Sequence, residues 1–227
     1  MNRIKSLVAR MQDIPGKEQR ATQIQDMRAI RDKLQDAAQR ADTLREQSSA
    51  LAAIDAAEFV GSARQGLTKV ASRASALKKR YDDGAGFDRK RADQTLTLIN
   101  ESLEQVSTTV TKGWKGLIED QTKRYRPLAE AATRATLPGA AGLNEAIELL
   151  DGWRDDPPRS RQAADDYLTN AARLPTAIAN LGLEGRAGRF MVDASNGRAK
   201  AKDLQDPDVL AFLELHPAVW AMLKVGL

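Results

Sequence analysis

Apolar residues recur at alternating steps of three and four from Val60 to Leu117, interrupted once between residues 82 and 87. This heptad spacing places one narrow apolar stripe on each of two helices, as in a coiled coil. Gly84 and Gly86 can adopt positive φ, and Asp82 and Asp83 can satisfy free backbone groups in a tight connection. The pattern predicts two antiparallel neighbouring helices joined by a turn at 82–87.

Composition favours the same kind of fold. Aromatic residues make up 4% of the 227 residues and charged residues 29%, a mixture typical of long helices rather than of a large globular core. Alternating runs of β-branched residues between turns, which would predict strands, are not evident. We therefore expect an all-α protein, a long antiparallel coiled-coil hairpin with a small helical C-terminal domain.

Residues 1–16 predict a short amphipathic helix. Ile4, Leu7, Val8 and Met11 fall on one helical face, and the pair Pro15-Gly16 is expected to end the helix. Basic residues flank the stripe, which would suit contact with a membrane surface. Docking onto the protein's own body or onto a partner subunit is favoured, because the stripe is short and contains neither Trp nor Phe.

Residues 17–126 predict the hairpin itself. In its first arm, the heptad frame that starts at Met27 would place Asp55 and Glu58 in the apolar stripe. A charged residue is unsuited to that position, so the frame slips there, through either a stutter-like defect or a short break.

The lengths of the two arms lead to a partner prediction. The second arm, from Asp88 to Tyr125, has roughly 38 residues and a length of about 57 Å. Folded back from the turn, it covers residues 44–81 and leaves 18–43 without a partner in the hairpin. We therefore expect Met27, Ile30, Leu34 and Leu44 to bind the C-terminal half, a second copy or another protein.

Residues 127–227 predict short helices joined by loops. Pro127 should end or kink the preceding helix, and Ser160 should cap a helix that reaches Leu174. The glycines at 182, 185, 188 and 197 indicate a stretch rich in loops. The segment Asp206-Pro207-Asp208 is typical of a helix start, and His216-Pro217 of a helix end.

Two interpretations, core packing and partner binding, are open for the apolar residues near the C-terminus and for Trp114. Phe212, Leu215 and Trp220 are too apolar to remain exposed as one patch, so they should complete a core or bind a partner. Trp114 is expected to pack beneath the C-terminal domain, and the alternative is an exposed anchor for a partner.

Charge is divided unevenly along the chain. Residues 1–126 carry 24 Lys and Arg against 17 Asp and Glu, whereas residues 127–227 carry 11 against 14. Six cations would gather at the hairpin tip and could hold phosphates, although outward-facing, solvated positions are the favoured interpretation. They are Lys78, Lys79, Arg80, Arg89, Lys90 and Arg91.

The sequence offers little catalytic chemistry. It has no cysteine and one histidine, so a metal site would need oxygen ligands alone, and the glycines at 182–188 lack the phosphate-loop pattern. No secretory signal is evident, and no run of 18 apolar residues would span a membrane. We expect no cofactor, metal, catalytic residue or small-molecule substrate, and a cytoplasmic location.

These features favour a non-catalytic interaction or scaffold subunit that binds a protein partner or a second copy. The alternative is a nucleic-acid-binding accessory factor that uses the basic tip.

Overall fold

The computed structural model describes residues 2–54, 57–82 and 88–223. It is all-helical, about 85% helix, and has no strand among these residues. The elements are α1 (Asn2–Ala52), α2 (Ala57–Asp82), α3 (Arg89–Arg134), α4 (Ala140–Asp151), α5 (Arg161–Asn180), α6 (Gly185–Ser195), η1 (Ala201–Gln205), α7 (Pro207–Leu215) and η2 (Pro217–Met222), the last named η for their 3₁₀ geometry.

The chain divides into two compact units. Unit 1 comprises Met1–Ser48 and Glu58–Val110, and unit 2 comprises Ser49–Ala57 and Thr111–Leu227. The division falls within α3, earlier than the boundary at residue 126 that the sequence suggested. The buried positions of α3 change there too, because Trp114 and Ile118 follow Val110 at steps of four, and Leu117 is only half-buried.

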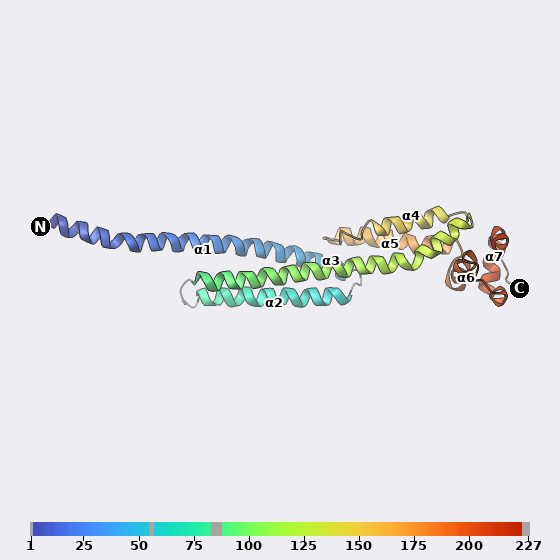
Figure 1. Ribbon diagram of the computed structural model, residues 1–227, viewed down its shortest axis with the longest axis horizontal. Coiled ribbons are helices and arrows are strands. Elements are labelled where there is room, and N and C mark those ends of the chain that lie inside the picture. The colour runs from blue at the N-terminus through green and yellow to red at the C-terminus, as the bar shows by residue number, and fades with distance from the viewer. Residues whose placement is uncertain (1, 55–56, 83–87, 224–227) are drawn as a thin grey trace. The chain divides into compact units, whose positions relative to one another are not determined.

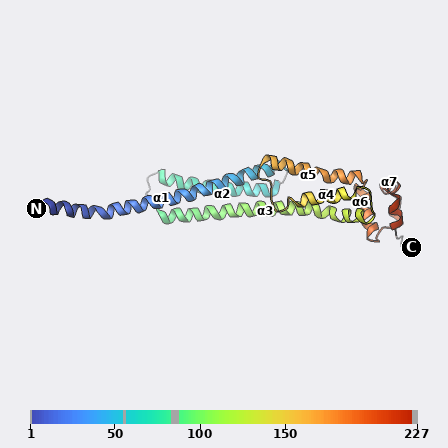
Figure 2. The same cartoon turned by 90° about the horizontal axis from the view of Figure 1, so that it is seen from above.

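In unit 1, the C-terminal half of α1 lies beside α2 and the first half of α3 in both views (Figures 1 and 2). Contacts between α1 and α3 join residues whose numbers rise together: Asp26 with Arg89, Lys33 with Asp93, and Arg40 with Glu104. Contacts between α2 and α3 join numbers that run oppositely: Leu77 clusters with Ala92 and Leu96, Arg73 binds Ser102, and Gly66 faces Val106. The same stretch of α3 therefore contacts both α1 and α2.

From Asp26 onward, the expectation that residues 18–43 lack a partner in the hairpin is wrong. Ile30 is 4% exposed and packs with Leu77, Ala92 and Leu96, and Leu34 lies against this cluster. The physical reason is the end of α1 at Ala52, just before the charged Asp55 that cannot occupy the apolar stripe. Of the two alternatives for the frame slip, the short break agrees with the structure.

Several helices continue through prolines where we expected them to end. α1 passes Pro15-Gly16, α3 passes Pro127, and α5 passes Pro175. A proline within a helix removes one backbone hydrogen bond and costs about 3 kcal/mol. Beside Pro127 and Pro175, the packing of buried neighbours such as Leu128 and Leu174 offsets that cost. The helix ends expected at 16 and 126 are not observed.

Unit 2 is organised around Trp114, which is fully buried as expected. Its indole N–H donates to the Trp153 carbonyl at 2.6 Å, and its ring meets Tyr167 edge-on with centroids 4.8 Å apart. The Tyr167 hydroxyl donates to Gln121 Oε1 at 2.7 Å. Burial raises the pKa of Tyr167, and the hydrogen bond to Gln121 opposes that rise. These contacts tie α3 to α5 and to the end of α4.

The caps predicted in unit 2 are confirmed. Ser160 accepts a hydrogen bond from the Ala163 N–H at the start of α5, and Asp206 accepts one from the Asp208 N–H at the start of α7. α7 ends at Leu215, directly before His216-Pro217. The stretch that we expected to be rich in loops instead contains α6, whose buried residues include Phe190 and Met191.

Candidate functional site

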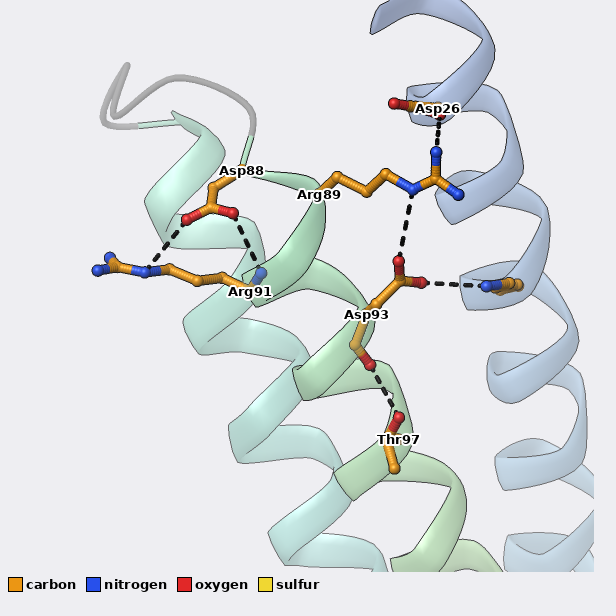
Figure 3. Close-up of polar contacts among 7 residues, drawn as sticks. Asp26, Asp88, Arg89, Arg91, Asp93 and Thr97 are labelled. Atoms are coloured by element: carbon orange, nitrogen blue, oxygen red, sulfur yellow. Dashed lines mark hydrogen bonds and ion pairs between the residues drawn. The ribbon is translucent and has the colours of Figure 1, made fainter.

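The cations predicted at the hairpin tip differ in their surroundings. The connection 83–87 and the side chains of Lys78 and Arg80 lie outside the described residues. Lys79 and Lys90 are exposed. Arg91 pairs with Asp88 at 3.2 Å, while Arg89 reaches Asp26 on α1 at 2.6 Å and Asp93 at 3.6 Å (Figure 3).

Arg89 and Asp93 belong to a polar network between α1 and α3. Lys33 on α1 lies 3.0 Å from Asp93, so Asp93 receives a cation from each helix. The hydrogen bond from Lys33 is the main cause that lowers the pKa of Asp93, and the charges of Lys33 and Arg89 act in the same direction. Of the predicted phosphate-binding residues, Arg89 therefore contributes to holding α1 against α3, and its charge is already compensated.

The predicted partner-binding residues of α1 divide into two groups. Ile30 and Leu44 are buried and Leu34 is half-buried, so these three belong to the interior of unit 1. Met27 is 48% exposed, as is Ile24 to a similar extent. While the chain keeps this fold, Met27 is the member of the predicted set that a partner can reach most easily.

The partner-binding residues predicted near the C-terminus also divide into a buried and an exposed group. Phe212 is 1% exposed and belongs to the core of unit 2, which agrees with the core alternative that the sequence left open for it. Leu215 is 70% exposed and Trp220 is 47% exposed, and Leu210 on the same helix as Leu215 is also exposed. Residues 210–220 therefore present three large apolar side chains to solvent.

His216 has a structural position between these exposed residues. Its Nε2 lies 3.0 Å from the Leu181 carbonyl oxygen, and its ring is 4.9 Å from that of Phe212. The imidazole thus connects the end of α7 to the end of α5. This agrees with the interpretation of His216 as a residue of the helix break.

A small hollow of about 180 Å³ lies between α6, η1 and α7, and sequence reasoning did not find it. It is lined by Arg186, Arg189, Phe190, Asp193, Asp203, Asp206 and Val209. Arg186 pairs with Asp206 at 3.0 Å across one side. Only the spacing of these residues could have predicted the hollow from sequence. That spacing was not recognised, because residues 182–197 were expected to form loops.

The described residues offer neither a metal site nor a membrane span. No group of three or more His, Cys, Asp or Glu side chains in this part of the chain is arranged to hold a metal ion. No helix within the described ranges is long and apolar enough to cross a membrane.

Comparison with protein-family models, curated proteins and solved structures found no match to this chain.

Proposed function

We propose that this protein is a non-catalytic interaction subunit of a larger protein assembly, bound to its partner through α7 and η2. The observation that carries the proposal is the exposure of Leu215, Trp220 and Leu210 within one short segment. Large apolar side chains gain free energy when they leave water, about 25 cal/mol per Å² of buried apolar surface. Tryptophan is also enriched among the residues that dominate binding energy.

The proposed architecture suits a scaffold. We propose that α2 and the first part of α3 form an antiparallel coiled-coil hairpin, supported by the opposite order of their contacts and by the buried stripe residues Val70, Leu77, Leu96 and Leu103. Such a hairpin presents long, regular surfaces. The absence of cysteine suits a reducing compartment, and we propose a cytoplasmic location.

The test is a comparison of captured partners. Leu215→Ser with Trp220→Ser should abolish recovery of a partner from the native cell, measured by quantitative mass spectrometry of affinity-purified protein. Leu168→Ser is the matched control, because Leu168 is a large exposed apolar residue on α5 of the same unit. A partner recovered equally with the double variant would contradict the proposal, provided that circular dichroism shows that the variant is folded.

The second candidate function is nucleic-acid binding at the tip, favoured by the exposure of Lys79 and Lys90 near the facing ends of α2 and α3. Each cation that neutralises a phosphate releases counterions, so affinity for DNA or RNA would fall steeply with salt. Lys79→Glu with Lys90→Glu should then abolish binding and leave Arg89 in its ion pairs. Under the interaction-subunit proposal, we expect no salt-dependent affinity in the wild type and unchanged partner recovery in the variant.

A further inference from the structure

The exposed side of α7 combines apolar and acidic side chains. The buried residues of this helix are Val209, Phe212 and Leu213, and its other residues are exposed. On the exposed side, Leu210 and Glu214 are four positions apart, and Asp208 and Leu215 are seven positions apart. At these spacings each large apolar residue shares a face of the helix with a carboxylate. The surface that carries the proposed function is therefore both apolar and acidic.

The negative charge on this surface is not compensated. Residues 206–223 contain neither lysine nor arginine. Asp206 is paired with Arg186 of α6 at 3.0 Å. The carboxylates of Asp208 and Glu214 are exposed and have no cation beside them among the described residues. Two negative charges therefore remain available to a partner that covers Leu210, Leu215 and Trp220.

The arginines of α6 do not reverse this charge. Arg186 and Arg189 line the hollow beside α7 together with Asp193, Asp203 and Asp206. Carboxylates outnumber guanidinium groups in the hollow as well, and Arg186 is already paired. The acidic character of α7 thus continues into its surroundings.

Acidic charge beside exposed apolar residues restricts the class of partner. It repels anionic lipids and the phosphates of nucleic acids, and surfaces that bind anionic membranes carry Lys and Arg beside their apolar residues instead. The described residues contain no strand whose edge could pair with an extended peptide. The partner that matches both properties is a helix whose apolar face is flanked by Lys or Arg.

We propose that α7 and η2 bind an amphipathic helix of another protein whose apolar face is flanked by Lys and Arg. Leu210, Leu215 and Trp220 contact the apolar face, and Asp208 and Glu214 attract the flanking cations. Because these carboxylates are exposed, they determine which helices bind and how fast they associate more than they add affinity. This inference rests on the proposed function and adds the chemistry of the partner.

The test uses two synthetic amphipathic helical peptides of about 18 residues, or five turns. Both have a leucine face, which is flanked by lysine in one peptide and by glutamate in the other. Fluorescence anisotropy of each labelled peptide, titrated with the whole chain, gives the two dissociation constants. We expect the lysine peptide to bind about tenfold more tightly, which corresponds to about 1.4 kcal/mol. At about 1 M salt most of this difference should disappear, because the screening length is then about 3 Å.

Two variants of the chain assign the preference to the carboxylates. Asp208→Lys with Glu214→Lys should reverse it, so that the glutamate peptide binds more tightly. Asp208→Asn with Glu214→Gln should abolish it without reversal. The second variant keeps the test decisive if circular dichroism shows that lysine in the first turn of α7 disturbs the fold.

A matched control changes the same amount of charge elsewhere in unit 2. Glu145 and Glu148 are exposed on α4 and have no cation beside them among the described residues. Glu145→Lys with Glu148→Lys should therefore keep the preference of the wild type for the lysine peptide. Loss of the preference in this control would overturn the inference, because the net charge of the chain would then be its cause.

Other outcomes separate this inference from the proposed function. If the wild type binds both peptides equally, and Leu215→Ser with Trp220→Ser abolishes that binding, the surface binds partners but the inferred chemistry is wrong. Binding of neither peptide would overturn the inference too. So would binding to vesicles of phosphatidylcholine and phosphatidylserine that is lost in the same double variant, since the partner would then be a membrane. The proposed function itself fails only if this double variant still recovers the cellular partner.

Discussion

Gly188 in α6 lies so close to the Leu183 carbonyl oxygen that a Cβ atom there would overlap it, and Leu128 of α3 is also near. Both neighbours belong to unit 2, and the nearest one is backbone, which cannot move aside as a flexible side chain can. Gly142 in α4, by contrast, has no atom near the position of a Cβ. Two helical glycines of the same unit therefore differ in what a methyl group would meet.

The first prediction compares these two positions. Gly188→Ala should lower the free energy of unfolding by about 1–3 kcal/mol, as overpacking does when backbone has to shift. Gly142→Ala should raise it by about 0.5–1 kcal/mol, because alanine loses less conformational entropy in a helix. Urea denaturation followed by tryptophan fluorescence measures both. Equal effects of the two substitutions would show that α6 does not approach Leu183 as closely as described.

In α1, residues that were predicted to share one apolar seam differ in how deeply they are buried. Ile30 and Met27 were expected to act together, yet Ile30 is buried in the cluster with Leu77 and Ala92, and Met27 is half exposed. The two residues are three positions apart and share one helical face, but Met27 lies one turn before the cluster that covers Ile30. The polar pairs on either side of that cluster remain in water.

The second prediction follows from this division. Ile30→Ala should lower the free energy of unfolding of unit 1 by about 2 kcal/mol or more, because it removes a buried side chain and leaves a cavity. Met27→Ala should change it by less than about 0.5 kcal/mol, as exposed positions usually do. Far-UV circular dichroism during urea denaturation measures both values. A similar loss for Met27→Ala would place that residue in an interface.

Local signals in the sequence predicted individual elements better than their arrangement. The caps at Ser160 and Asp206 depend on side chains that reach the backbone two or three residues away, so the sequence alone locates them. The reversal of α1 depends on contacts such as Lys33 with Asp93, which are 60 residues apart. No local pattern encodes that pairing. The helix ends expected at 126 and after Leu174 are not observed, because tertiary packing offsets the local cost of the prolines that follow.

The candidate surfaces were also hard to predict where they depend on contacts between residues far apart in the sequence. Leu215 and Trp220 could be named from sequence only together with Phe212, because all three are apolar residues of one C-terminal stretch. Phe212 could not be separated from them, because its burial depends on α5 and His216. Likewise, the pairing of Arg89 with Asp26 needs α1 beside α3 and could not be predicted.

At the scale of the whole molecule, the two units carry different optical probes. All three tryptophans, Trp114, Trp153 and Trp220, belong to unit 2. Unit 1 consists of α1, α2 and half of α3, so it supplies much of the helical signal. Tryptophan fluorescence therefore reports on unit 2 alone, whereas circular dichroism reports on both units.

The last prediction uses this separation to ask whether the units unfold independently. Ile30→Ala removes packing from unit 1 only, so it should shift the early part of the circular dichroism transition and leave the fluorescence midpoint unchanged. Gly188→Ala acts on unit 2, so it should lower the fluorescence midpoint. Because additive effects are the rule for distant sites without shared neighbours, the double variant should show both changes at their single-variant sizes. If Ile30→Ala instead moves both probes together, α3 transmits the loss from one unit to the other, and the chain unfolds as a single cooperative body.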